Sequence, residues 1–156
     1  MCYDYHSAKL QENNMETSAR NVFSGRVVAV NSGAVNDEVE LAVDGGISIV
    51  ASITKVSTNN LGLKPGATAI ALIKASFVLL MNDADKYLLS TRNQFAGTVS
   101  KVTPGAVNAE VIVDLPGGAS IASIVTMGSI KNLGLEAGKR VTAIVKASQV
   151  ILAVPK

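Results

Sequence analysis

The sequence predicts an all-β protein made of two tandem five-stranded barrels, each with one short helical turn. Residues 18–80 align without a gap on residues 90–152, and 30 of these 63 positions are identical. Each copy contains short runs of alternating or β-branched residues, which are typical of strands. Glycine pairs and short polar links separate the runs, so the connections are short. A repeat of this length indicates a duplicated structural unit.

Each copy begins with three predicted strands. They cover residues 25–30, 38–43 and 47–54 in the first copy and 97–102, 110–115 and 119–126 in the second. In the second strand, Val39, Leu41 and Val43 share one face and glutamates share the other, the period of a half-buried strand. The pair Gly45-Gly46, repeated as Gly117-Gly118, supplies a tight turn into the third strand.

The rest of each copy predicts a helical turn and two further strands. Residues 54–63 suit a short helical turn that ends at Gly62. Residues 67–73 and 77–81 then form two strands, joined by Lys-Ala-Ser at 74–76. Five strands with a helical turn between the third and fourth favour a barrel of the OB type. Such small units bury little core and have open strand edges, so we expect an oligomer.

Four segments follow from the repeat. They are an N-terminal extension expected to be disordered (1–16), a first domain (17–82), a polar linker (83–89) and a second domain (90–156). No apolar run approaches the ~20 residues that span a bilayer, and the N-terminus lacks the apolar core of a secretory signal. A single cysteine, Cys2, excludes an internal disulfide. We therefore expect a cytoplasmic protein without membrane contact.

The repeats lack the residues of the common catalytic sites. The one histidine, His6, lies outside them, and neither a zinc-type Cys/His spacing nor a P-loop lysine is present. The acidic residue shared by both copies, Glu38 or Glu110, lies on the polar face of a strand. A solvated or interface-paired carboxylate is favoured there over a general base. We expect a protein that is not an enzyme.

Nucleic acid, the usual ligand of OB barrels, is also disfavoured. Such barrels stack bases on aromatic rings in a basic groove. Aromatic residues make up 4% of the chain, the formal net charge is +2, and the basic residues are scattered. We therefore expect no nucleic-acid partner.

Two short motifs in each copy consist of hydrogen-bond donors. They are Ser18-Ala19-Arg20-Asn21, Ser90-Thr91-Arg92-Asn93, Lys74-Ala75-Ser76 and Lys146-Ala147-Ser148. Burying a tetrahedral dianion such as molybdate requires donors on all sides and roughly two positive charges. One arginine fork and one lysine satisfy this need, whereas a protonated phosphate would find no acceptor. Each motif alone suits a strand-entry turn, with Asn21 capping its own backbone, or a hairpin link. Their joint recurrence favours binding.

A third recurring motif, Gly-Ala-Val-Asn, occupies residues 33–36 and 105–108. Gly33 and Asn36 suit a turn between the first and second strands. If a symmetry axis of an oligomer lies near this turn, its amides and the Asn36 side chain could also surround an anion. The turn is the favoured interpretation, and the two are compatible.

The motifs together resemble the Mop-type molybdate-binding domain. The resemblance rests on TSARNVFSGRVVAVNSGAVN, NLGLKPG and IKAS in the first copy and on their counterparts in the second. A chain with two such domains is similar to the double-domain molbindins, which bind molybdate and also tungstate. This resemblance implies OB-type barrels, six of which form a ring, and hence a homotrimer of this chain. It also implies oxyanions held between the Ser-Ala-Arg-Asn segment of one domain and the Lys-Ala-Ser segment of another, with a second class of site on the threefold axis.

The resemblance also implies which residues are ligands. Those of the interface sites are Ser18, Ala19, Arg20, Lys74, Ala75 and Ser76, with Ser90, Thr91, Arg92, Lys146, Ala147 and Ser148 in the second copy. Those of the axial sites are Gly33, Val35 and Asn36, with Gly105, Val107 and Asn108. Two departures, Thr91 in place of alanine and a serine moved by one position in the third strand, leave open whether the halves bind equally.

The implied function is intracellular storage, buffering or homeostasis of molybdate. The alternative is a molybdate-responsive regulatory module that contacts another protein.

Overall fold

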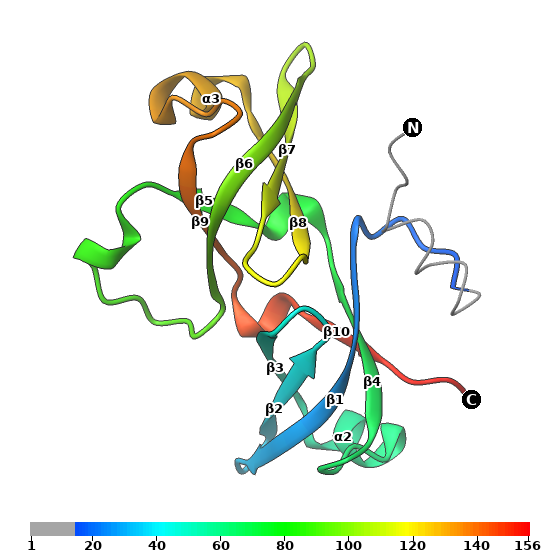
Figure 1. The fold of residues 1–156 in the computed structure, drawn as a ribbon. Helices are drawn as coiled ribbons and strands as arrows, with labels where there is room; N and C mark the ends of the chain where they lie inside the picture. The colour runs from blue at the N-terminus through cyan, green and yellow to red at the C-terminus, as the bar shows by residue number, and fades with distance from the viewer. Residues whose placement is uncertain (1–14) are drawn as a thin grey trace.

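The computed structural model describes residues 15–156, which form two antiparallel five-stranded sheets (Figure 1). The first sheet contains, in spatial order, β10 (Ile151–Ala153), β4 (Thr68–Ile73), β1 (Asn21–Ser32), β2 (Asn36–Val43) and β3 (Ile47–Thr54). The second contains β5 (Leu79–Met81), β9 (Arg140–Ile144), β6 (Gln94–Pro104), β7 (Asn108–Asp114) and β8 (Ser120–Thr126). The predicted all-β class with two five-stranded units is confirmed. The disorder expected for residues 1–16 falls almost entirely outside the described residues.

The first strand of each copy is longer than the sequence predicted, because it serves two neighbours. β1 pairs with β4 through its first half and with β2 through its second half, and the register with β2 shifts between Val27 and Ala29. β6 shows the same shift between Val99 and Lys101. Such bulges increase local twist and let one strand curl from one side of a barrel to the other. The outer strands β3 and β10 then approach each other without forming a ladder.

The predicted helical turn is confirmed in both copies as α2 (Lys55–Leu61) and α3 (Met127–Leu133). The hydroxyl of Thr54 accepts a hydrogen bond of 3.1 Å from the amide of Ser57, which caps the start of α2. Gly62 ends the helix in the left-handed conformation, with φ of 63°. Three single 3-10 turns complete the described elements: η1 (Ala75–Phe77), η2 (Ala84–Lys86) and η3 (Ala147–Gln149). No helix within residues 15–156 is long and apolar enough to cross a membrane.

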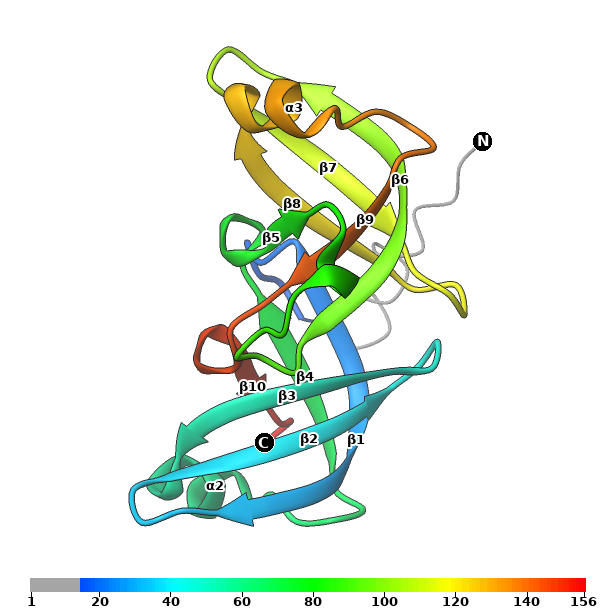
Figure 2. The ribbon, with the colours of Figure 1, turned by 90° about the vertical axis from the view of Figure 1, so that its left-hand side faces the viewer.

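The last strand of each copy lies in the sheet of the other copy. β5, from the first copy, pairs with β9, and β10, from the second, pairs with β4 (Figures 1 and 2). The sequence predicted each of these strands in the barrel of its own copy, and the structure corrects that placement. Each sheet is therefore incomplete without the other copy.

A continuous hydrophobic core joins the two halves. Phe23, Leu41 and Ile73 from the first copy belong to the same buried cluster as Phe95 and Val113 from the second. The two glycine turns also meet, as Figure 2 shows at the tips of the β2–β3 and β7–β8 hairpins. A Cβ on Gly117 would overlap the carbonyl of Gly45, so this approach requires glycine.

Candidate functional site

The asparagine of each Ser-x-Arg-Asn motif joins the two copies. Asn21 is fully buried, and its side-chain amide both accepts from the amide of Ala122 and donates to its carbonyl, each at 2.8 Å. Asn93 makes the same pair of bonds with Val50, at 2.8 and 2.7 Å. The side chain thus imitates a peptide group along β8 or β3, which are edge strands. The sequence interpretation of Asn21 as a cap on its own backbone is wrong.

The arginine of each motif pairs with a glutamate of the other copy. Arg20 donates from Nη2 to Oε1 of Glu110 at 2.8 Å, and Arg92 pairs in the same way with Glu38. The arginine side chains are 54% and 56% exposed, and the glutamates 26% and 45%. Both glutamates are thus partly exposed and paired across the two copies, in agreement with the expected solvated or interface-paired carboxylate. Their pairing with the arginines was not predicted from the sequence, although all four residues recur at the 72-residue offset.

The Lys-Ala-Ser motif lies beside the Ser-x-Arg-Asn motif of the same copy. Asn21 stands opposite Ile73 in the β1–β4 ladder, so Ser18–Arg20 and Lys74–Ser76 flank the same end of it. Lys74 and Ser76 are exposed, while Ala75, the first residue of η1, is buried. In the second copy Lys146 and Ser148 are likewise exposed. Small alanines at this position let the backbone pack closely.

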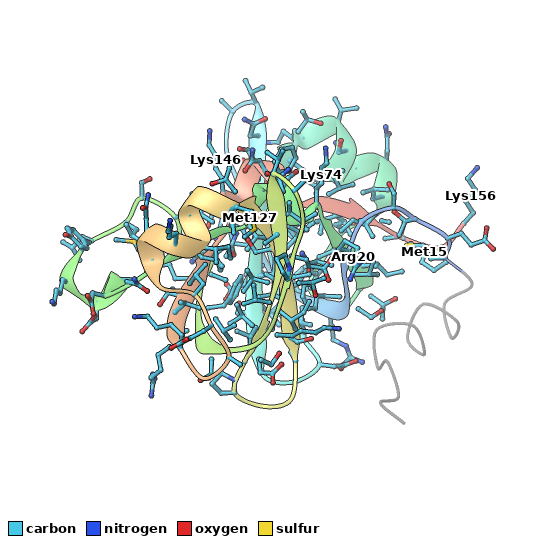
Figure 3. All side chains as sticks on the ribbon, turned by 90° about the horizontal axis from the view of Figure 1, so that it is seen from above. Met15, Arg20, Lys74, Met127, Lys146 and Lys156 are labelled. Atoms are coloured by element: carbon cyan, nitrogen blue, oxygen red, sulfur yellow. The ribbon has the colours of Figure 1, made fainter. Side chains whose placement is uncertain are left out.

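These segments pack against the third strand of the other copy, η1 against β8 and η3 against β3. We call the group of Ser18–Asn21, Lys74–Ser76 and β8 the first junction. The second junction consists of Ser90–Asn93, Lys146–Ser148 and β3. Seen from above, Lys74 and Lys146 lie toward the same edge of the molecule (Figure 3).

Each junction presents donors to solvent. Within residues 15–156, neither Lys74 nor Lys146 has a carboxylate partner. The Nζ of Lys74 lies 5.6 Å from the ring centroid of Phe77, and Gln149 stands at the equivalent position beside Lys146. The hydroxyl-bearing Ser18 and Ser90 are also exposed. A junction can therefore supply ammonium, hydroxyl and backbone amide donors, with the arginine already engaged by glutamate.

Two sequence differences between the copies have structural roles. The hydroxyl of Thr91 donates to the carbonyl of Val145 at 2.8 Å and accepts from the amide of Asn93 at 3.2 Å. It therefore fastens the motif to the end of β9. The displaced serine, Ser123, is fully buried and donates to the carbonyl of Val78 at 2.7 Å, where the first copy has Ala51.

The Gly-Ala-Val-Asn motifs form the predicted turns, at opposite ends of the molecule (Figure 1). The amide of Gly33 donates to the carbonyl of Asn36 at 2.9 Å, and Gly105 does the same with Asn108. Val35 and Val107 are each 72% exposed at the tips. The ammonium of Lys55 donates to the carbonyl of Gly33 at 2.9 Å, whereas methionine occupies the equivalent position in the second copy. One chain therefore does not bring the two turns together.

Other features of the described residues suggest no different chemistry. No group of three or more His, Cys, Asp or Glu side chains within residues 15–156 could hold a metal ion. A hollow of about 480 Å³ lies beside β1, β2 and β4 and is lined in part by Arg26, Asp44 and Thr68. It contains none of the recurring donor motifs.

Comparison with known proteins identifies relatives over nearly the whole chain. The TOBE domain family model matches residues 17–80 and again residues 89–152. The molybdenum-pterin-binding protein MopA of Rhodobacter capsulatus is 47% identical over 141 residues, 90% of this chain and 53% of MopA. The DNA-binding transcriptional dual regulator ModE of Escherichia coli K12 is 31% identical over 147 residues, 94% of this chain and 55% of ModE. The chain thus spans about half the length of the curated relatives that it matches.

A solved structure resembles the whole described fold. It is a molybdate-bound crystal form of the cytoplasmic molybdate-binding protein ModG, with a TM-score of 0.87 and 48% sequence identity. The match covers 90% of this chain and 100% of the ModG chain.

Proposed function

Because this chain belongs to the TOBE domain family, with one copy of the domain in each half, we propose that it binds molybdate as an intracellular store or buffer. Tungstate, which has the same charge and shape, is an alternative ligand. The observation that carries the proposal is the recurrence of an exposed donor cluster at two equivalent junctions. Similarity to the molybdate-binding ModG over its full length supports it.

The proposed ligands are the donors of the two motifs. In the first copy they are Ser18, Ala19, Arg20, Lys74, Ala75 and Ser76, and in the second Ser90, Thr91, Arg92, Lys146, Ala147 and Ser148. A molybdate dianion accepts hydrogen bonds on all four oxygens and needs compensating positive charge when water is removed. The ammonium groups of Lys74 and Lys146, which have no carboxylate partner among residues 15–156, supply such charge. The serine hydroxyls and the alanine amides supply neutral donors; the amide of Ala19, which donates to the hydroxyl of Thr17 at 3.1 Å in the structure, would exchange that partner for the anion.

We propose a homotrimer, in which neighbouring chains complete the junctions. In one chain, Lys74 and Ser76 are exposed, so a bound anion would remain largely in water. Beside them lies Leu79, which is 64% exposed, and its counterpart Ile151 is 63% exposed. Matched apolar side chains at both junctions favour a symmetric contact with further copies. We further propose that the tips bearing Asn36 and Asn108 form separate axial oxyanion sites, each from several chains.

The proposed role is binding without catalysis, in the cytoplasm. The one histidine of the sequence, His6, lies outside the repeats, so neither donor set offers a Ser-His pair. The scarcity of aromatic residues, 4% of the chain, argues against base stacking and hence against a nucleic-acid partner.

A molybdate-responsive regulatory module is the second candidate. The similarity to the Escherichia coli ModE, named as a DNA-binding regulator, favours it. The present chain matches about half of that protein. Capture of a cellular protein by this chain only when molybdate is present would favour regulation over storage.

Titration calorimetry with molybdate, and with sulfate and phosphate in parallel, tests the proposal. We expect molybdate binding at more than one ion per chain, with much weaker sulfate binding. The double variant Lys74→Ala/Lys146→Ala should lose the interface sites, whereas Lys64→Ala, which removes an exposed lysine elsewhere, should not. Loss of one member of a hydrogen-bonded charge pair typically costs ~2–5 kcal/mol. Unchanged stoichiometry in the double variant would refute the ligand assignment.

A further inference from the structure

We propose that Glu110 and Glu38 are tethered competitors of the bound oxyanion: each carboxylate occupies an arginine of the site and is displaced when the anion binds. The inference rests on the proposed function, because it concerns the same two junctions. It assigns an affinity-determining role to two acidic residues outside the donor motifs.

The contact between arginine and glutamate is made twice, independently. Arg20 reaches Glu110, 90 residues away, and Arg92 reaches Glu38. Both pairs cross from one copy to the other. Each glutamate stands at the start of the second strand of its copy, on the polar face. A contact that recurs at both pseudo-equivalent places is a property of the fold rather than a chance placement of one flexible side chain.

The charge of the junction also favours displacement of the carboxylate by the anion. With arginine and lysine alone, a junction carries two positive charges, which match a dianion. With the glutamate in place, the net charge falls to one, and a carboxylate lies within hydrogen-bond distance of the same guanidinium. A dianion entering beside that carboxylate would be repelled by it. Binding with full charge compensation therefore requires the carboxylate to leave.

The carboxylate can leave the arginine at a low cost in free energy. The first pair is bound through one nitrogen, Nη2, and one oxygen, rather than through a two-pronged contact. Both arginine side chains are more than half exposed. Exposed ion pairs of this kind shift an equilibrium by only about 1.4- to 5-fold. Water or an anion can therefore replace the carboxylate without unfolding the strand that carries it.

An opposite role would be that of a positioning residue. A glutamate that merely orients the arginine would improve oxyanion binding, and removing this glutamate would weaken the binding. The two roles therefore predict opposite changes in molybdate affinity for the same substitution, so the experiment separates them.

The test is titration of the full chain with molybdate in the variants Glu38→Gln, Glu110→Gln and the double variant. Glutamine keeps the size of the side chain but removes the competing charge. We expect molybdate to bind about 1.4- to 5-fold more tightly at the altered junctions, the factor by which such an exposed ion pair holds the arginine. The matched control is Glu40→Gln, which removes the same charge from the same strand. Glu40 contacts the hydroxyl of Ser48 at 3.0 Å, so its loss should leave the affinity nearly unchanged.

A second pair of variants, Glu38→Asp and Glu110→Asp, keeps the charge and shortens its reach. These should also bind more tightly, by a smaller factor, and they remain informative if a glutamine variant folds poorly. Equal or weaker binding in the glutamine and aspartate variants would overturn the inference. Absence of molybdate binding in the unaltered protein would instead overturn the proposed function.

Discussion

The buried asparagines offer a direct test of how the two copies are held together. In Asn21→Ala, the amide and carbonyl of Ala122 both lose their side-chain partner at a position that is 5% exposed. A buried backbone group left without a partner costs ~1–3 kcal/mol. Two such groups predict a loss of about 2–6 kcal/mol in the free energy of unfolding. For a chain of this size, that corresponds to a fall of roughly 4–24 °C in melting temperature.

The isosteric variant Asn21→Asp sharpens the test. It keeps the oxygen that accepts from the amide of Ala122 but replaces the donor with a second oxygen facing the carbonyl. We expect it to be destabilised at least as much as the alanine variant, because a charge is buried without a partner.

Urea unfolding followed by circular dichroism measures these changes, with Asn60→Ala as the control. Asn60 is an exposed helix residue, so its loss should change stability by less than about 0.5 kcal/mol. A loss below about 1 kcal/mol in Asn21→Ala would refute the reasoning, since the paired bonds would then contribute little.

Three further changes test individual contacts by thermal unfolding. Thr91→Ala removes the hydroxyl bond to Val145 and should cost about 0.5–1.5 kcal/mol. Because the backbone amide and not the hydroxyl is the proposed donor at position 91, the number of molybdate ions bound in calorimetry should not change, and a lower stoichiometry would show that the hydroxyl acts in binding. Ser123→Ala leaves the carbonyl of Val78 without its buried partner and should cost about 1–3 kcal/mol; no loss would mean that water replaces the hydroxyl. Gly128→Ala, in α3 with no heavy atom closer than 3.7 Å to the new Cβ, should stabilise by up to about 1 kcal/mol, and destabilisation would contradict the open space seen there.

Most local structure followed from the amino-acid sequence. The 72-residue repeat, the alternation of Val39, Leu41 and Val43, and the helix ending at Gly62 are visible without coordinates. Strands, hairpins and helical turns occur at the same positions in the structure. These features are visible in the sequence because period-2 burial and a left-handed glycine depend only on neighbouring residues in the chain.

The donor motifs could also be identified from the sequence, because a duplicated polar stretch stands out against the varying residues around it. Their partners were not visible. Nothing adjacent to Arg20 in the chain points to Glu110, and nothing adjacent to Asn21 points to Ala122. Such pairs depend on which segments meet after folding.

The exchange of β5 and β10 between the two sheets shows most clearly what the sequence alone does not predict. The pattern of a strand specifies which of its side chains are buried, and both copies offer an equivalent edge, β4 or β9, to receive it. The two pairings satisfy the same hydrophobic pattern, so the sequence alone does not distinguish them. The tertiary structure decides between the two pairings. Each last strand joins the other sheet because of the chain direction after η1 and η3, the contact between the glycine turns and the reciprocal asparagine bonds.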